Sequence, residues 1–597
     1  MSPMANGTAG SEPRVGNRGL QAAARSLVRL IRHHGLMITS LILLMSLTAP
    51  FTLGDTNVYV SDILLYYGKS PLGSNSLLWE FGHLLWRPFG WLLLEAGAPA
   101  LGGLFHWNIG LLCTAILIFI NVAAGIVTVL VWESLVLRIT GSRAIAYGAA
   151  LAFACANAFF AYMRSGCAYV VGLLFVTASV WIVCRASGHN AITRRAACGA
   201  GLMLAAAILF WLPYVLSVPG VVALGLRRQI GSVFGWWNRE NIAFGAHLLG
   251  TFALSVILCL ALVLAARRID SVSEAKAWAG ESDHGWSQNR RFLRIATGLP
   301  RGFLYFGKDG TLYKRFLWKD PYDPVSLSRL LRASLWKVAL FYASAAALCF
   351  ELLRRPDNHR ALGVLLAGVG PTIAFAIFVF EPGSPERYLP VYPFLILAIA
   401  QVLRGYPRPY RLMPTVIALF LVTMAATNVY ATYRPRIASE DRPSAQRVES
   451  LKPRLTDRDL VSVLSNRDRL YLFVNRSPFH RLNQPRPLRL YDVLEPANSR
   501  VARWRWEFAA AALGAWNQGG EVWVSKRLWA VKPLPEWDWV EGDDARASWK
   551  DIAEFFTPLQ IAEDLGGDDG FFRLLRADPN ESRLSAFARD ALRDPSR

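Results

Sequence analysis

The chain has 597 residues, of which 53% are hydrophobic and 18% charged, with a mean hydropathy of +0.29 and a net charge of +21. This hydropathy is too high for an ordinary soluble protein and too low for a chain that lies wholly in a membrane, so we expect a membrane part and a soluble part. Residues 1–431 hold 37 Lys and Arg against 18 Asp and Glu, while residues 432–597 hold 27 against 25. The basic excess therefore belongs to the membrane part, where it indicates topology and lipid contact and not a nucleic-acid footprint.

The first span is predicted at Gly35–Leu53, an apolar run of 19 residues, long enough to cross a bilayer. Arg25, Arg29 and Arg32 precede it and place the N-terminus in the cytoplasm. Residues 1–34 are therefore a cytoplasmic segment, and their polar, Gly- and Ser-bearing start is typical of disorder. No small-residue cleavage pattern follows the run, so we interpret it as a retained anchor.

Further hydrophobic segments predict a series of spans. In chain order they are Trp107–Val131, Ala144–Tyr162, Ala168–Val183, Ala196–Leu226, Ala246–Ala266, Leu335–Leu353, Ala361–Phe380, Leu389–Val402 and Met413–Tyr430. Seven cysteines lie in or beside these segments without any CxxC or Cys/His cluster. The sequence therefore predicts no metal site, and it contains no Walker or GxGxxG motif that indicates a nucleotide cofactor.

Segment Ala196–Leu226 decides the topology, because it is too long for one span and short for two. Trp211–Tyr214 (WLPY) and Pro219 interrupt it, and a proline removes a helical hydrogen bond. A hairpin of two short helices gives about eleven spans and puts all short basic loops in the cytoplasm, as the positive-inside rule requires. A single span would put the last three basic clusters outside, so we choose the hairpin. The loops at 54–106 and 267–334 and the C-terminus are then external.

Residues 432–597 are predicted to form a soluble α/β domain on the external side. Strands are expected at Arg469–Val474, Leu488–Val493, Glu521–Ser525 and Gly570–Leu575, and helices at Val501–Trp516 and Ser548–Leu565. Eight tryptophans lie in this region. They are explained either by packing near a membrane surface or by a sugar-binding face.

Candidate catalytic acids open the first external loop. Asp55 and Asp62 are two helical turns apart, so a helix puts them on one face, and acids at the edge of a span tend to be functional. His83 and Arg87 follow in GHLLWRP and point the same way if this stretch is helical. Structural explanations stay open: Asp55 caps a helix that begins at Thr56, Asp62 forms a salt bridge, and His83 with Arg87 anchors an interfacial helix.

A second polar segment, Glu381–Tyr388 (EPGSPERY), lies between two spans on the same side. The long basic loop adds Lys308, Lys314, Arg315 and Lys319 among aromatic residues. Together they predict an acid-bearing cleft rimmed by bases, which suits a substrate with a phosphate beside a lipid tail. An arginine matches phosphate oxygens with a planar fork, and a carboxylate can deprotonate an attacking hydroxyl. Alternatively, Arg387 pairs with a neighbouring glutamate, and the basic loop is a lipid-facing surface.

Gly54-Asp55 after the first span, the mid-chain hairpin and Glu386-Arg387-Tyr388-Leu389-Pro390 resemble the GT-C superfamily of polyprenyl-phosphate-sugar-dependent glycosyltransferases. That superfamily includes protein mannosyltransferases and lipid A aminoarabinose transferases, and the resemblance covers roughly residues 35–430. It implies that Asp55 is the general base, that Arg387 contacts the donor phosphate within the substrate-binding Glu386-Arg387-Tyr388 motif, and that transfer is inverting and metal-independent. One departure is that Thr56 follows Asp55, where many members carry an Asp-Glu pair; Asp62 is the second candidate acid.

These features predict a polytopic α-helical membrane protein with about eleven transmembrane helices, GT-C-like, and a C-terminal α/β domain. We expect it to move a sugar from a polyprenyl-phosphate carrier to a hydroxyl of a lipid, glycan or protein acceptor on the external face of a bacterial cytoplasmic membrane. The expected partners also include membrane lipids, and no nucleic acid. The alternative is a multi-span transporter or lipid-handling protein. Transporters place charges mid-membrane within repeated halves, whereas here the acids lie at span ends. A third possibility is an assembly protein that acts through its C-terminal domain.

Overall fold

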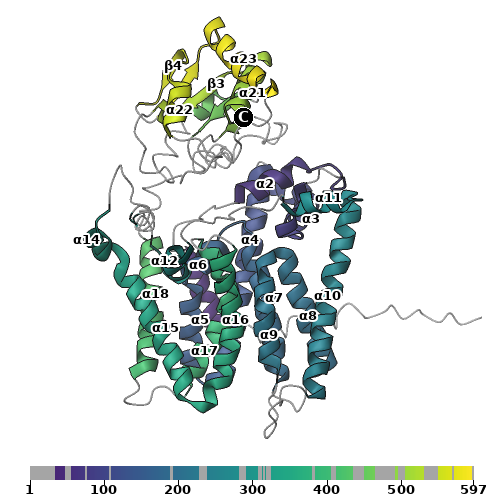
Figure 1. The fold of residues 1–597 in the computed structure, drawn as a ribbon, viewed down its shortest axis with the longest axis vertical. Helices are drawn as coiled ribbons and strands as arrows, with labels where there is room; N and C mark the ends of the chain where they lie inside the picture. Colours follow the sequence, from purple (N-terminus) through teal and green to yellow (C-terminus); the bar gives the residue numbers. More distant parts are fainter. Residues whose placement is uncertain are drawn as a thin grey trace, which may run out of the picture.

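The structure of the protein is a computed structural model. It describes residues 34–46, 56–73, 77–105, 109–187, 192–226, 238–280, 291–306, 312, 316, 325–379, 384–404, 412–433, 450–456, 458–463, 491–494, 504–529, 549–567 and 570–593. Two parts are visible in Figure 1: a bundle of long helices and, beyond one end of it, a small sheet with its own helices.

Every segment predicted to span the membrane is helical over most of its described residues. These helices are His34–Ser46, α4 (Ile109–Thr140), α5 (Arg143–Ala154) with α6 (Asn157–Met163), α7 (Tyr169–Ala186), α8 (Arg194–Phe210), η3 (Leu212–Ser217) with α9 (Val218–Gly225), α10 (Arg239–Arg267), α14 (Leu327–Leu330) with η4 (Leu331–Leu335) and α15 (Trp336–Arg354), η5 (Pro356–Asn358) with α16 (His359–Phe378), η6 (Pro385–Val391) with α17 (Tyr392–Leu403), and α18 (Leu412–Tyr433). The connecting helices are α2 (Thr56–Leu65), η1 (Leu77–Trp79), η2 (Phe81–His83), α3 (Trp86–Phe105), α11 (Val272–Gly280) and α12 (Arg291–Phe303).

By length and hydropathy, seven of the described helices can cross a membrane, or eight if α5 and α6, bent by 70°, form one span. The chain is therefore a multi-pass α-helical membrane protein, as predicted. The predicted number of about eleven spans is reached only if three shorter helices, His34–Ser46, α8 and Leu212–Gly225, also cross.

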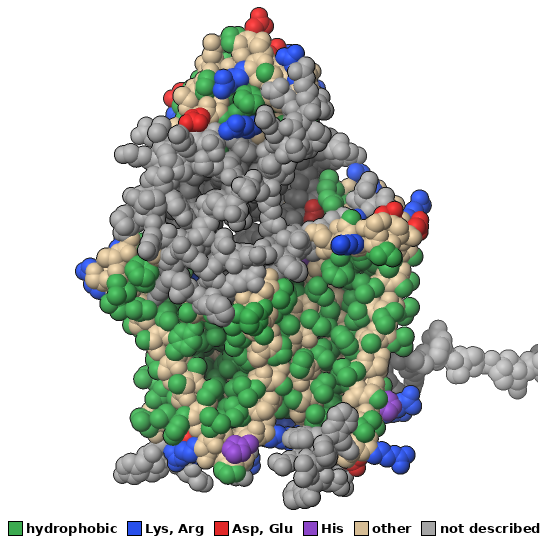
Figure 2. All heavy atoms as spheres, viewed as in Figure 1, with side chains coloured by type: hydrophobic (Ala, Val, Ile, Leu, Met, Phe, Trp, Pro, Cys, Tyr) green, Lys and Arg blue, Asp and Glu red, His purple; other side chains and the backbone are tan. Residues whose placement is uncertain are grey.

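Hydrophobic side chains cover the face of the helical part that Figure 2 shows, and lysine and arginine side chains lie near its lower and upper edges. Helix α10 contributes Leu254, Ile257 and Leu262, each more than 60% exposed. A soluble bundle would bury side chains of this kind, whereas the hydrocarbon of a bilayer covers them without cost.

Three of the predicted basic loops meet at one end of the bundle, which we call the arginine end. Arg138 at the end of α4 donates to the carbonyl oxygen of Arg185 at the end of α7, at 3.4 Å. Arg360 at the start of α16 donates to the carbonyl oxygen of Leu224 at the end of α9, at 2.9 Å. Arg138 and Arg360 both lie near Cys184. Clustering of loop arginines at one end agrees with the topology chosen from the sequence.

The hairpin predicted for Ala196–Leu226 is present. Helix α8 ends at Phe210, whose carbonyl oxygen lies against His83 at the opposite end of the bundle, which we call the site end. The chain then returns through η3 and α9 to Leu224 at the arginine end. The reversal falls at Trp211, whose backbone is extended (φ −155°, ψ 111°), within the predicted WLPY interruption.

Helix α17 is the centre of the bundle, because 83% of the Pro385–Leu403 span is buried, against 11% for α10. Close helix contacts surround its Phe394. A Cβ atom added to Gly220 of α9 would lie 2.5 Å from the Phe394 ring, and one added to Gly368 of α16 would lie 2.2 Å from it. The glycines therefore let three helices approach around one fully buried ring.

The C-terminal turn of α12 is held by side chains from four other helices. The carbonyl oxygens of Arg301, Gly302, Phe303 and Tyr305 accept hydrogen bonds from Asn157 of α6, Tyr392 of α17, Asn428 of α18 and Lys337 of α15. Carbonyl groups at the end of a helix have no partner within the helix, so these side chains satisfy them. The end of α12 is thereby fixed against η6, which carries the second predicted polar segment.

The C-terminal part contains a five-stranded sheet in the order β2-β1-β3-β5-β4. Its elements are β1 (Asp459–Ser462), β2 (Tyr491–Leu494), α21 (Trp504–Asn517), β3 (Val522–Ser525), η9 (Lys526–Trp529), α22 (Trp549–Phe556), β4 (Ile561–Leu565), β5 (Phe571–Leu574) and α23 (Asp578–Arg593), preceded by η7 (Lys452–Arg454). Strand β1 pairs in parallel with β2 and β3, and β5 pairs antiparallel with β3 and β4. Phe508, Phe556 and Leu584 of the three helices pack on Leu460 and Val524.

The α/β class of this part is confirmed, and one predicted element is wrong. The helix expected over Ser548–Leu565 ends at Phe556, and residues 561–565 form β4. Pro558 lacks a backbone N–H and disfavours helix at the residue before it, and the stretch beyond it pairs with β5. Strand β1 was not predicted, and the strand predicted at Arg469–Val474 lies outside the described residues.

Candidate functional site

A buried ion cluster forms the first half of the site. Arg87 of α3 donates through Nε to Asp62 Oδ2 of α2 at 2.7 Å and through Nη1 to Glu80 Oε2. Its guanidinium carbon lies 4.8 Å from the centre of the Tyr59 ring. Arg87 is 4% exposed and Glu80 7%. We call Asp62, Glu80 and Arg87 the Arg87 cluster. Separating α2 from α3 would leave buried charges without a partner, which is costly, so the cluster holds the two helices together.

The start of α2 is hydrogen-bonded to the connection between α6 and α7. Thr56 Oγ1 accepts from the Gly166 N–H at 2.8 Å, and Trp86 Nε1 donates to the Gly166 carbonyl at 3.0 Å. Asn121 of α4 donates to the carbonyls of Ser165 and Cys167 on either side. This arrangement fixes the first described residue after Asp55 in place. Asp55 itself, the predicted general base, lies outside the described residues.

His83 connects α2 to the end of α8. Its Nε2 lies 3.2 Å from Tyr59 Oη, and its Nδ1 lies 3.2 Å from the Phe210 carbonyl oxygen. The imidazole also meets the Tyr59 ring edge-on at 5.4 Å and the Tyr169 ring at 6.0 Å. Although His83 ends η2 and Arg87 lies in α3, both contact the Tyr59 ring, so they do converge. Both are buried, which does not fit an anchor among lipid headgroups.

The second half of the site is η6, the segment that contains Glu386 and Arg387. Pro385 and Pro390 supply no N–H groups, and the segment is a 3-10 helix that leads into α17. Glu386 Oε2 accepts from Tyr162 Oη of α6 at 2.6 Å, and Glu386 Oε1 lies 3.7 Å from Arg387 Nε. The predicted pairing of Arg387 with a glutamate is therefore present with Glu386, at long distance.

Two aromatic residues join the halves. Tyr169, at the start of α7, has its ring 4.8 Å from that of Tyr162 and 4.7 Å from that of Trp211. The Arg387 guanidinium lies over Trp211, at 5.8 Å. The contacts therefore run from His83 through Tyr169 and Trp211 to Arg387. The first loop and the Glu386–Tyr388 segment meet at one end of the bundle, as expected, and these packed rings lie where an open cleft was predicted.

A further cation, Arg164, lies at the site end between α6 and α7. It is 4% exposed, donates through Nε to the Phe160 carbonyl and stacks over the Phe160 ring at 3.8 Å. Burial lowers the pKa of its guanidinium to about 10, which leaves it charged at neutral pH. In the sequence, Arg164 lies two residues after Tyr162, which bonds to Glu386, and two residues before Gly166, which bonds to the start of α2. It therefore adds a buried positive charge to the connection between α6 and α7.

The remaining predicted site residues divide in two groups. Tyr388 is fully buried, with its Cβ against Gly302 of α12, which places it behind Arg387 in the core. Lys308, Lys314, Arg315 and Lys319 lie outside the described residues.

Tyr59, Glu80, Tyr162, Arg164, Tyr169 and Trp211 were not predicted as site residues. The sequence carried a signal for two of them. Arg164 is a charged residue in a short connection between two apolar segments, and Trp211 opens the WLPY interruption of a predicted span. The tyrosines carried no signal, because aromatic residues at span ends are common at membrane interfaces.

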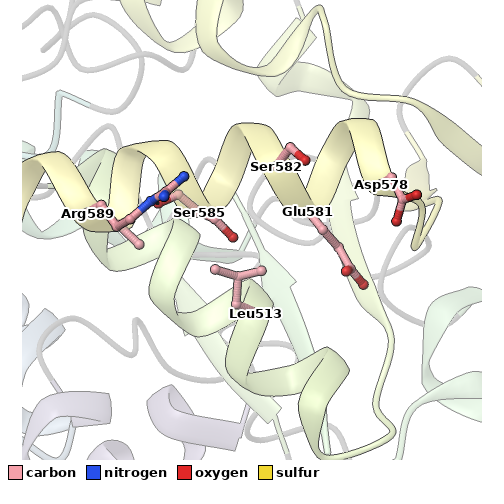
Figure 3. A pocket seen from close by; sticks show the side chains of 7 residues that line it. Leu513, Asp578, Glu581, Ser582, Ser585 and Arg589 are labelled. Carbon is pink, nitrogen blue, oxygen red and sulfur yellow. Dashed lines mark hydrogen bonds between the residues drawn. The ribbon is translucent and has the colours of Figure 1, made fainter.

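A pocket also lies on the C-terminal domain, where Leu513 of α21 faces Asp578, Glu581, Ser582, Ser585 and Arg589 of α23 (Figure 3). Glu581 already accepts from Arg576 at 2.8 Å. This pocket is separate from the residues of the bundle. Among the described residues of the chain, no group of three or more His, Cys, Asp or Glu side chains could hold a metal ion.

The arrangement at the site end has a definite chemical character. One half holds the carboxylates of Asp62 on α2 and Glu80 before η2. The other half holds Arg387 on η6 and Arg164 after α6. Asp62 and Glu80 are engaged with Arg87, and Asp55, the residue before α2, lies outside the described residues. An acid next to cations beside a membrane surface can accept a proton from a hydroxyl while a phosphate is held.

The chain matches no protein-family profile and no curated protein. Among solved structures it is similar to ArnT from Cupriavidus metallidurans bound to undecaprenyl phosphate, with 12% identity and a TM-score of 0.49 over 92% of this chain and 98% of that one. It is also similar to AglB from Archaeoglobus fulgidus, an archaeal oligosaccharyltransferase in complex with an inhibitory peptide and a dolichol-phosphate (13%, TM-score 0.44, 86% and 72%). A third is the arabinofuranosyltransferase AftD from Mycobacteria (16%, TM-score 0.43, 83% and 37%). Likeness at this level assigns no role to any residue of this chain.

Proposed function

We propose that this multi-pass membrane protein is a glycosyltransferase of the GT-C type, which moves a sugar from a polyprenyl-phosphate carrier to an acceptor hydroxyl. The observation that carries the proposal is the meeting of α2, which follows Asp55, and η6, which bears Arg387, at one end of an apolar bundle. The contacts His83–Tyr169–Trp211–Arg387 connect them. A lipid-linked donor suits this end of the bundle, because its chain can lie against the apolar helices while its phosphate pairs with Arg387, whose side chain is 17% exposed.

In this reaction the acceptor oxygen attacks C1 of the sugar, and the bond between C1 and the phosphate oxygen breaks. The hydroxyl proton passes to the carboxylate of Asp55, and the polyprenyl phosphate leaves with the electron pair of the broken bond. Arg387 binds the departing phosphate with its planar fork. Attack on the face opposite to the leaving phosphate inverts the configuration at C1. The Arg87 cluster takes no part in the bond changes and holds α2 in place.

The test is transfer from a radiolabelled polyprenyl-phosphate sugar by the full-length protein in liposomes. We expect Asp55→Asn to lower kcat by about a hundredfold or more, as for loss of a general base, and Arg387→Gln to raise KM for the donor. Asp270→Asn is the matched control, because Asp270 is an exposed acid just beyond α10, and it should retain full activity. Near wild-type transfer by Asp55→Asn would refute the assignment of the base. A wild-type protein that moves lipid phosphate across the bilayer without sugar transfer would favour the transporter alternative.

A further inference from the structure

We propose that His83 is a positioning residue, which sets the separation between the start of α2 and Arg387 without touching substrate. The proposal rests on the proposed function, because it concerns the geometry of the same site. It differs from the substrate-binding role expected for His83 from the sequence.

The two hydrogen bonds of His83 assign its tautomer. The Phe210 carbonyl oxygen can only accept, so Nδ1 carries a hydrogen; when the ring is neutral, Nε2 accepts from the Tyr59 hydroxyl. Both rings are enclosed, with Tyr59 3% and His83 8% exposed. His83 therefore joins α2 and α8, which are far apart in the sequence, through the two nitrogens of one ring.

On one side, the Tyr59 bond controls the orientation of α2. Tyr59 lies four residues after Asp55 in the sequence, and its ring is also covered by the Arg87 guanidinium. With the start of α2 held at Thr56 by Gly166, the Tyr59–His83 bond fixes the rotation of the helix about its axis. That rotation sets the orientation of Thr56, the residue next to Asp55 in the sequence.

On the other side, the Phe210 bond fixes the break of the hairpin. Phe210 is the last residue of α8, and its carbonyl has no partner further along the helix. The next residue, Trp211, carries the Arg387 guanidinium on its ring. His83 is thus bonded to one residue of α2 and to the neighbour of the ring that supports Arg387. An error of 1 Å in such a separation can slow a reaction a hundredfold.

The experiment combines Tyr59→Phe, His83→Gln and the double variant in liposomes. Tyr59→Phe keeps the ring under Arg87 and removes only the hydroxyl, so it folds even where His83→Gln is poorly tolerated. We expect each single variant to lower kcat by roughly tenfold to a hundredfold with an unchanged KM for the donor. The double variant should lose no more than the worse single variant, because both remove one connection. Tyr66→Phe, on the same loop, and His247→Gln are the matched controls and should behave as wild type, because His247 is half-buried on α10 and its ring bonds to a carbonyl oxygen of its own helix.

Hydrogen exchange without substrate gives an independent readout. In Tyr59→Phe, amide exchange should become faster both in α2 and in residues 209–217, although only α2 carries the substitution. Losses of kcat that multiply in the double variant, a rise in KM alone, or faster exchange confined to α2 would each overturn the proposal. If the wild-type protein transfers no sugar, the proposed function fails, and the exchange measurement still decides whether His83 connects the two elements.

Discussion

Replacement of Arg87 by methionine is predicted to destabilise the bundle by about 3 to 5 kcal/mol, the usual range for breaking a buried ion pair. Methionine preserves most of the buried apolar stem, so the loss reports the charge. The side chains of Asp62 and Glu80 are 15% and 9% exposed, so water shields Asp62 somewhat better. Glu80, left without its guanidinium, should account for the larger share of the loss.

The free energy of unfolding would be measured by SDS titration in mixed micelles. Adding Glu80→Gln to Arg87→Met should recover most of the lost stability, because no uncompensated charge then remains at the more buried position. Arg332→Met is the matched control, because Arg332 is exposed and donates to the Ser328 carbonyl at 3.3 Å. A loss for Arg87→Met below about 1 kcal/mol, the range of surface pairs, would refute the reasoning.

Two further substitutions test the packing that supports the site. Gly220→Ala should cost about 1 to 3 kcal/mol of stability, because its Cβ would lie 2.5 Å from Phe394, whereas Gly370→Ala, with open space around it, should be neutral or stabilising in the same titration. Asn428→Leu should lower the free energy of unfolding by about 3 kcal/mol or more, because each buried backbone group left unpaired costs about 1 to 3 kcal/mol. The neighbouring Thr427→Val should cost less than about 1 kcal/mol. Equal losses in either matched pair would contradict the prediction.

The membrane part was predictable because its signals are local. Long apolar segments require helices in a bilayer. The distribution of basic residues between these segments indicated that Ala196–Leu226 is a hairpin, which turns back at WLPY. The error at Ser548–Leu565 has a different origin. The periodicity of a short segment does not distinguish a helix from a strand whose pairing partner lies elsewhere in the sequence, and here Ile561–Leu565 pairs with β5.

The site was predictable only in outline. Span-end polar residues indicated α2 and η6, because charges beside a bilayer are costly. The roles within the site depend on contacts between distant residues. Asp62 and Arg87 are 25 residues apart, and Tyr162 and Glu386 are 224 apart. No pattern along the chain shows that Asp62 is held by an arginine while Glu386 is held by a tyrosine, so Asp62 stayed a second candidate acid beside Asp55.

The fastening of the α12 turn has a consequence for biosynthesis. Asn428 in α18 donates to Phe303 in the turn and to Cys155 at the bend between α5 and α6, and accepts from Tyr305. Proteins are made from the N-terminus at about 5 to 20 residues per second, so roughly 120 residues and several more helices emerge between the α12 turn and Asn428. A nascent chain released before α18 enters the bilayer would hold α2 and η6 but lack this fastening. We therefore expect the active centre to mature only after the last helix of the bundle has been inserted.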